Sequence, residues 1–307
     1  SVFGNHITGE TFLMNEPINP MTGKDISFLK NKKIAFIFHL DIALLTHRLP
    51  LVEHAMKHGA EVYVLAGDTG RGKIIRNLGI NFIPLEISPN GMNPLDDLRT
   101  VRQIYLHLNR IRPDLVHNVS IKPVLYGSIV SRFFGKWPVV NAVSGLGFTF
   151  SADGKAKIIK KLLSPLFRCA MGFTKSVTIF QNTSDMQTML SAGFLKNEQA
   201  KLIKGSGVNC SRFKPSPFPQ SPVVMLPARL LWDKGVGEFI DAAKIVHDKF
   251  PEVKFVLVGQ ADHDNPKAIA RNQVLEWISS MPYLEWWGEK EPDKMAEVIS
   301  RSTIVVL

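Results

Sequence analysis

Cysteine is rare in this sequence, and long apolar runs are missing from it. The two cysteines, Cys169 and Cys210, lie far apart and form no C-x-x-C or Cys/His cluster, which argues against a disulfide framework and against a zinc site. No apolar run approaches the roughly 18 to 20 residues that cross a bilayer, and the first residues lack the charged and apolar regions of a signal peptide. We therefore expect a cytoplasmic protein with two reduced thiols.

Positive charge is abundant but unevenly spread. The formal net charge is +10, and residues 151–214 contain eleven Lys and Arg residues against three acidic ones. Such a segment fits a polyphosphate ligand, an anionic membrane or nucleic acid. Its apolar neighbours are aliphatic rather than stacking aromatic residues, and no recognition-helix, RNP or zinc-finger pattern accompanies it. We expect no nucleic-acid partner, and a non-enzymatic nucleic-acid-binding protein is kept as an alternative.

Short apolar runs alternate with helical patterns, which predicts an α/β fold with parallel sheets. A length of 307 residues and a hydrophobic content of 45% indicate two domains with real cores. The expected strands are 34–38, 61–66, 81–85, 114–117, 139–143, 177–180, 202–203, 223–226, 253–258, 283–287 and 304–307. Helices are expected at 48–58, 71–78, 94–111, from Pro123 onward, and at 185–191, 266–278 and 292–300, with a further helix between the strands 223–226 and 253–258. Residues 155–171 are expected to form one helix kinked at Pro165 or two helices, the second starting there.

The composition also divides the chain. Residues 1–30 are rich in Gly and Pro without a sustained period, and we read them as an irregular leader with no assigned function. A first domain is expected over 31–211 and a second over 223–307. The Pro-rich stretch 212–222 between them is expected to be a semi-rigid linker.

Residues 223–258 form the most informative stretch, because they are predicted to be a strand, a helix and a second parallel strand. The loop that leaves the first strand contains Arg229 and Lys234, and Gly235 precedes the helix body. Two cations beside the free N–H groups of a helix start favour a bound anion. A diphosphate suits this site, although two basic residues in a surface loop can also be solvated charges.

The string ARLLWDKGVGEFIDAA in the same stretch resembles the donor-binding segment of retaining glycosyltransferases of family 4, which is written G-R-L-x-x-x-K-G. The leading Gly is Ala228 here. The resemblance implies that Arg229 and Lys234 bind the diphosphate of a nucleotide sugar and stabilise the leaving group. It also assigns Gly235 to this site, together with Gly259 and Gly288, which follow the next two strands.

Three segments of the first domain are similar to acceptor-side motifs of that family. HLDIALLTHRLP resembles a subgroup that reads S-H-R-L-P-L after its first strand, and PDLVHNVSIK resembles P-D-x-V-H-x-H-x-x-K. VSGLGF matches H-G-L-G-F except that a serine stands at the position of the family's histidine. A locally satisfied histidine and a plain two-glycine turn are the structural alternatives. The substrate-binding residues implied by the resemblance are His47, Arg48, His117, Lys122, Ser144, Gly145 and Gly147.

For the whole chain the resemblance implies a GT-B fold, with two Rossmann-like doubly wound domains and the acceptor domain first. It implies transfer of a hexosyl or N-acetylhexosaminyl group from a nucleotide-diphosphate sugar, UDP-linked in our reading, with retention. The active site is expected in the cleft between the domains. The acceptor is expected to be a glycan or a polyprenyl-diphosphate-linked saccharide. No metal and no cofactor are expected, because cations take the place of a divalent ion. A nucleotide-sugar epimerase of the same fold is the alternative enzyme.

Residues 155–171 present an apolar stripe and a basic stripe at helical spacing. We expect this segment to rest on an anionic membrane surface, which makes the protein peripheral on the inner face of the cytoplasmic membrane. A core-packed helix with a solvated back is the competing interpretation.

Family members continue beyond the position of Leu307 with a segment E-x7-E that contacts the donor. We therefore expect the second domain to be incomplete, with the apolar run 304–307 exposed, a partly mobile second half and little transferase activity. A naturally short variant is the alternative.

Overall fold

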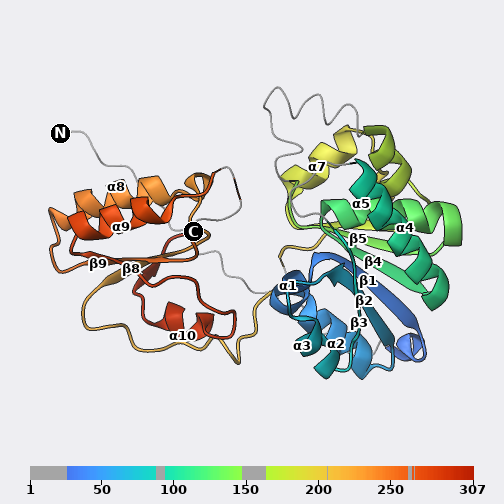
Figure 1. The fold of residues 1–307 in the computed structure, drawn as a ribbon, viewed down its shortest axis with the longest axis horizontal. Helices are drawn as coiled ribbons and strands as arrows, with labels where there is room; N and C mark the ends of the chain where they lie inside the picture. The colour runs from blue at the N-terminus through green and yellow to red at the C-terminus, as the bar shows by residue number, and fades with distance from the viewer. Residues whose placement is uncertain (1–25, 88–93, 147–163, 206, 262–264, 266) are drawn as a thin grey trace, which may run out of the picture. The chain divides into compact units, whose positions relative to one another are not determined.

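The computed structural model describes residues 26–87, 94–146, 164–205, 207–261, 265 and 267–307. The chain divides into two compact units, Ser1–Ser206 and Gly207–Leu307 (Figure 1). The boundary therefore precedes the predicted end of the first domain at 211. The predicted linker, 212–222, belongs to the second unit, where the Ser216 hydroxyl lies 3.5 Å from the Ser300 carbonyl oxygen. Its role as a linker stays a prediction.

The first unit is built on a seven-stranded sheet in which all strands are parallel. Its strand order is β3-β2-β1-β4-β5-β6-β7. The strands are β1 (Lys33–Leu40), β2 (Glu61–Gly67), β3 (Asn81–Pro84), β4 (Leu115–Val119), β5 (Val139–Val143), β6 (Ser176–Phe180) and β7 (Ala200–Leu202).

This strand order contains a topological switch point. From β1 the chain moves to β2 and β3 on one side, and it then returns to place β4 on the other side of β1, where Phe36 is paired with His117. The connections that follow β1 and β4 consequently turn in opposite directions. In open parallel sheets ligands bind in the crevice that this divergence leaves at the carboxyl ends of the strands.

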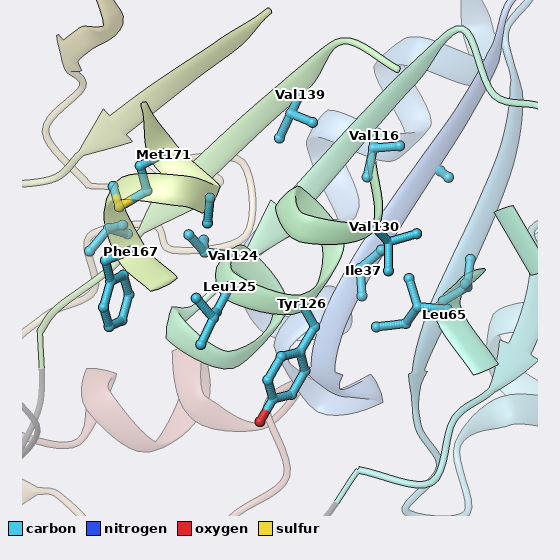
Figure 2. Close-up of a cluster of buried hydrophobic side chains, with 14 of the residues drawn as sticks. Ile37, Leu65, Val116, Val124, Leu125, Tyr126, Val130, Val139, Phe167 and Met171 are labelled. Atoms are coloured by element: carbon cyan, nitrogen blue, oxygen red, sulfur yellow. The ribbon is translucent and has the colours of Figure 1, made fainter. Parts of the chain in front are cut away.

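Helices cover both faces of the first sheet, because strands of a parallel sheet are apolar on both sides (Figure 1). One core contains side chains of α4, α5 and α7, and Figure 2 shows part of it, including Ile37, Leu65 and Val124. The other core contains side chains of η2, α2 and α3. The helical elements are η1 (Ile26–Leu29), α1 (Asp41–Ala43), η2 (Leu44–Arg48), α2 (Leu49–Lys57), α3 (Gly72–Asn77), α4 (Pro94–Ile111), α5 (Ile121–Val130), η3 (Ser131–Gly135), residues 164–171, α7 (Thr183–Ser191) and η5 (Asn197–Gln199).

The second unit contains a four-stranded parallel sheet with the order β10-β9-β8-β11. Its core lies between β8, β9 and the helices α8 and α9 (Figure 1). The run 304–307 is exposed as expected, with Leu307 fully so. The elements are β8 (Val223–Pro227), η6 (Trp232–Lys234), α8 (Val236–His247), β9 (Lys254–Val258), α9 (Arg271–Ser280), β10 (Leu284–Trp286), α10 (Met295–Ser300) and β11 (Ile304–Val305).

Several expectations were displaced by the structure. The helix expected at 48–58 is confirmed as α2, Leu49–Lys57, but α1 and the π-helical turn η2 precede it and carry the chain from Asp41 directly into it. The helix expected at 266–278 is replaced by α9, whose first residue is Arg271. Residues 155–163 of the predicted membrane segment and residues 1–25 of the leader lie outside the described part. No helix in the described ranges has the length and apolarity of a membrane span.

A buried polar cluster joins β4, β5 and α5 on the face covered by α4 and α5. The Asn118 amide donates to Asn141 Oδ1 over 2.9 Å, and the Ser128 hydroxyl donates to the same oxygen over 3.0 Å. All three residues are fully buried. Gly127 allows this close approach, since a Cβ atom there would lie 2.0 Å from Asn118 Oδ1.

We predict that Gly127→Ala destabilises the first unit. Alanine gains about 1 kcal/mol over glycine in a helix interior, but overpacking against the buried amide costs about 1 to 3 kcal/mol, so the free energy of unfolding should fall. Urea unfolding followed by circular dichroism measures the change. Gly145→Ala is the matched control, because a Cβ atom there meets nothing within 4 Å. Equal stability of Gly127→Ala and the wild type would contradict the prediction.

Candidate functional site

The switch point of the first sheet contains a buried histidine. His117 on β4 is 6% exposed, and its ring lies 5.0 Å from the ring of Phe36 on β1. Its Nε2 atom has no hydrogen-bond partner among the residues that the structure describes. Burial, and secondarily the positive charge of Arg48, lowers the pKa of His117 to about 3. The ring is therefore neutral at physiological pH and offers a nitrogen for a hydrogen bond.

His47 and Arg48 lie on η2, which follows β1 and α1. Burial and the Arg48 charge lower the pKa of His47, and burial lowers the pKa of Arg48. The Nε atom of Arg48 is buried without a hydrogen-bond partner in the described part of the chain. The structure thus brings Arg48 and His117 near each other, as the resemblance implies, whereas the His47 side chain is more exposed.

Lys122 lies in the first turn of α5, directly after β4. Its ammonium lies 3.4 Å from Asp97 Oδ1 of α4. The Lys122 side chain is 25% exposed and the Asp97 side chain is 30% exposed. Tyr126 donates its hydroxyl to the same carboxylate, and burial followed by this bond raises the pKa of Tyr126. Figure 2 shows the Tyr126 hydroxyl pointing away from the apolar cluster. Asp97 and Tyr126, which the sequence did not single out, therefore hold Lys122 in place.

The backbone enters α5 in an unfavourable conformation. Ser120, the residue between β4 and α5, has φ +74° and ψ 166°. A residue other than glycine rarely adopts such a conformation, which costs about 1 to 3 kcal/mol and is typical of functional sites. The strain lies at the carboxyl end of β4, beside Lys122, and no sequence pattern indicated it.

Asp41 is a further residue that sequence reasoning missed. It directly follows β1, is fully buried, and accepts hydrogen bonds from the Thr69 amide at 2.8 Å, the Thr69 hydroxyl at 2.6 Å and the Arg71 amide at 3.2 Å. The carboxylate therefore fixes the loop after β2 against the end of β1. An acidic residue immediately after an apolar strand was the available signal.

Ser144 and Gly145 follow β5, and both are exposed. Gly147 lies outside the described residues. The carboxyl ends of β4 and β5 are adjacent, since Val119 is paired with Ala142. Ser144 and Gly145 thus lie at the same edge of the sheet as Lys122, and their contact with substrate stays a prediction.

A pocket of about 210 Å³ lies at the carboxyl ends of β8 and β9 in the second unit. Arg229, Gly259, Glu289 and Lys290 are among its lining residues. Gly259 has φ +155°, and a Cβ atom there would lie 1.9 Å from the Ala228 carbonyl oxygen, so only glycine lets the two loops meet. Its amide donates to the Gly288 carbonyl oxygen over 3.0 Å. The structure therefore brings Arg229, Gly259 and Gly288 together and adds Glu289 and Lys290.

Lys234 lies on the turn that precedes α8. It ends η6, next to Gly235, which has φ +72° and precedes α8. Lys234 and Gly235 line a separate, largely apolar pocket of about 540 Å³ that also contains Phe239 and Ile304. The two cations that the sequence predicts for one diphosphate thus line different pockets, and their joint action stays a prediction.

The described residues contain no group of three or more His, Cys, Asp or Glu side chains placed to hold a metal ion. The charged groups beside β4 are Lys122 and Asp97, which are paired over 3.4 Å, and those in the pocket beside β8 are Arg229, Glu289 and Lys290. The expectation that no metal is needed stays a prediction.

We predict that His117 makes stability depend on pH. The folded-state pKa is about 3 against an ordinary value of 6.5, so below pH 6.5 the unfolded chain binds a proton that the folded protein does not. Above pH 6.5 His117 does not change the free energy of unfolding with pH. As the pH drops from 6.5 toward 3, the free energy of unfolding falls by up to about 1.4 kcal/mol per pH unit. His117→Leu should flatten this part of the profile.

Urea unfolding between about pH 7.5 and pH 4.5 measures this effect for the wild type and for His117→Leu. His54→Gln serves as the control, because His54 is exposed on α2 and its replacement should leave the profile steep. Profiles of the same slope for the wild type and His117→Leu would show that the buried ring is not the source.

Comparison with known proteins agrees with this architecture. Residues 33–182 match the model of the "Glycosyl transferase 4-like" family. The chain is 27% identical over 264 residues to an N,N'-diacetylbacillosaminyl-diphospho-undecaprenol alpha-1,3-N-acetylgalactosaminyltransferase of Campylobacter jejuni, covering 81% of this chain and 67% of that protein.

Solved structures show the same fold. A glycosyltransferase from Rickettsia africae is similar with a TM-score of 0.65 at 15% identity, over 90% of this chain and 72% of that one. A sucrose-phosphate synthase from Thermosynechococcus elongatus has a TM-score of 0.67 at 16% identity, over 90% and 75%. A UDP-GlcNAc 2-epimerase from Neisseria meningitidis has a TM-score of 0.61 at 16% identity, over 89% and 76%. At these identities the likeness shows the GT-B fold alone. Together with the family match and the transferase relative, it places this chain among the glycosyltransferases of family 4.

Proposed function

We propose that this protein transfers a sugar, with retention, from a nucleotide-diphosphate sugar to a hydroxyl group of a lipid-linked saccharide. The observation that carries the proposal is the pocket of about 210 Å³ beside β8, with Arg229 and Lys290 in its lining. Typical small-molecule pockets measure about 300 to 1,000 Å³. This pocket therefore suits a diphosphate group rather than a whole nucleotide sugar.

The chemistry asks for positive charge in that position. Breaking the bond between the anomeric carbon and the diphosphate leaves negative charge on the departing oxygen. A guanidinium fixed beside that oxygen stabilises the transition state more than the ground state. Arg229 lies two residues after β8, and the Ala228 amide between them is bonded to the Val258 carbonyl oxygen over 2.9 Å, which fixes the loop. Its proposed role is charge stabilisation of the leaving group.

The acceptor is proposed to bind at the switch point of the first sheet. Arg48 and Lys122 supply positive charge there, and the buried Nε2 of His117 supplies a hydrogen-bond acceptor or donor. The family resemblance suggests that the departing phosphate oxygen takes the proton of the acceptor hydroxyl. A side-chain base is not required on that scheme.

A polyprenyl-diphosphate-linked saccharide is the acceptor class we propose. The Campylobacter jejuni relative is named for an undecaprenol-diphosphate-linked substrate. A diphosphate headgroup is also the chemistry that Arg48 and Lys122 would recognise. UDP is the proposed nucleotide, and the protein is proposed to work at an anionic membrane surface.

Two measurements test the proposal. Nucleotide sugars with UDP, GDP and dTDP should be compared for their effect on the thermal unfolding midpoint, and a UDP-sugar should raise it most. Transfer to a short-chain polyprenyl-diphosphate saccharide should then give a product with the donor's anomeric configuration. Release of an epimerised free sugar or nucleotide sugar, without transfer, would support the epimerase alternative and overturn the proposal.

Arg229→Ala is expected to lower kcat/KM about a hundredfold or more, because loss of one donor to a developing oxyanion costs about 3 to 4 kcal/mol. Initial-rate measurements with saturating acceptor give this value. Lys249→Ala, which removes an exposed cation after α8, is the matched control. Rates within about twofold of the wild type for Arg229→Ala would remove the basis of the donor-site assignment.

Lys234→Ala tests the second predicted cation separately. A loss similar to that of Arg229→Ala is expected if Lys234 reaches the same diphosphate. The double variant decides between one site and two: cations on one diphosphate give non-additive losses, whereas independent sites give additive ones. An unchanged kcat/KM for Lys234→Ala would show that this lysine only borders the apolar pocket.

A further inference from the structure

The outward face of α4 carries exposed apolar side chains beside basic ones. Leu98 is 65% exposed and Leu106 is 37% exposed. Arg102 lies between them at helical spacing and is also exposed. The opposite face of α4 packs into the core through Ile104 and Leu108. A solvated helix would be expected to carry polar residues where these leucines lie.

The turn η3 extends this exposed apolar area. Phe133 and Phe134 are 60% and 61% exposed. The Phe134 ring lies 4.7 Å from the ring of Tyr105 on α4, which places the two elements side by side. The Arg132 guanidinium lies 5.6 Å from the Phe133 ring and donates to the Cys169 carbonyl oxygen over 2.6 Å. The phenylalanines are therefore held on a fixed turn and are not part of a loose loop.

Positive charge is in excess on this part of the chain. Residues 94–136 contain seven Lys and Arg residues and three acidic residues, of which Asp96 and Asp97 are paired with Arg99 and Lys122. Asp114 is bonded to Lys32 over 2.9 Å, so it offers little to a further partner. Lys136, which follows η3, is exposed. An apolar patch with an excess of positive charge around it complements a partner that has an apolar interior and negatively charged groups on its outside.

We propose that α4 and η3 form the surface by which this protein lies on an anionic lipid bilayer. This α4–η3 surface consists of Leu98, Arg102, Leu106, Phe133, Phe134 and Lys136. Phenylalanine and leucine side chains would enter the headgroup region, while the basic side chains meet anionic headgroups. The inference rests on the proposed function, since a lipid-linked acceptor lies in such a membrane.

The position of α4 beside Lys122 of the proposed acceptor site favours a bilayer as the partner that covers the α4–η3 surface. Asp97, in the first turn of α4, bonds Lys122 at the start of α5. The helix has 18 residues and is about 27 Å long. Tyr105, which contacts Phe134 of η3, lies eight residues or about 12 Å beyond Asp97. A bilayer along α4 would bring the headgroup of a lipid-linked acceptor close to Lys122. Residues 164–171, the described part of the segment predicted to touch the membrane, are tied to this surface through Arg132.

Flotation with vesicles tests the aromatic part. The wild type should bind vesicles of phosphatidylcholine with about 30% phosphatidylglycerol more strongly than pure phosphatidylcholine. Phe133→Ser with Phe134→Ser should lower the partition coefficient about tenfold or more. Phe28→Ser is the matched control, because Phe28 is 68% exposed and lies on η1, next to Leu29 of the other core. Equal binding of all variants, or no binding of the wild type, overturns the proposal.

A second variant tests the charge. Arg102→Gln with Lys136→Gln should weaken binding to anionic vesicles about fivefold for each residue and leave binding to neutral vesicles unchanged. Lys57→Gln with Lys73→Gln removes the same charge from α2 and α3, which cover the opposite face of the sheet, and should have a smaller effect. Equal losses for the two pairs would show that net charge alone attracts the protein, against a specific surface.

Two readouts separate this proposal from the proposed function. All variants should keep the wild-type thermal shift with the nucleotide sugar, since none alters the pocket beside β8. Loss of vesicle binding with that shift intact supports the surface, whereas absence of any nucleotide-sugar shift contradicts the proposed function alone. Sedimentation velocity completes the test: a concentration-dependent dimer that Phe133→Ser with Phe134→Ser abolishes would show that a second copy, not lipid, covers the surface.

Discussion

The two candidate sites, one at the carboxyl ends of β1 and β4 and the other in the pocket beside β8, both depend on the placement of one strand inside a parallel sheet. In the first unit β1 lies between β2 and β4, and in the second unit β8 lies between β9 and β11. In each case the chain leaves the central strand in one direction and returns on its other side, which opens the edge of the sheet at the carboxyl ends. Arg48 follows β1 and Arg229 follows β8, so the same constraint positions both cations.

At the switch point of the first sheet, two residues are held in energetically unfavourable states by the structure around them. Burial, and secondarily the charge of Arg48, lowers the pKa of His117 to about 3, and Ser120 adopts a backbone conformation with positive φ. Asp97 and Tyr126 fix Lys122 over a salt bridge of 3.4 Å. The buried histidine and the strained serine each lower the stability of the fold. Together with the salt bridge they hold polar groups rigidly at the open edge of the sheet. A rigid arrangement of this kind is what recognition of a charged headgroup requires.

The sequence predicted the helices, the strands and the cationic residues, but not the contacts between residues far apart in the chain. The strand β5 and the helix α4 have the predicted bounds, because apolar period and flanking Pro residues are local signals. The bonds from Asp41 to Thr69 join positions 28 residues apart, and they depend on the register between β1 and β2. No local pattern contains that register. The turn that carries Lys234 depends on another such long-range contact, the bond from the Trp232 amide to the Lys267 carbonyl oxygen.

The distribution of positive charge ties the proposals together. A net charge of +10 on 307 residues would suit nucleic acid if it lay in one groove with stacking aromatics. Here three groups of described basic residues lie at different places in the fold: Arg229 and Lys290 line the pocket beside β8, Arg48 lies after β1, and Arg102 and Lys136 belong to the α4–η3 surface. A diphosphate donor, a diphosphate-linked acceptor and an anionic bilayer would each need one such location. If the three proposed anionic partners bind at these separate places, each should lose affinity with its own, shallow dependence on salt.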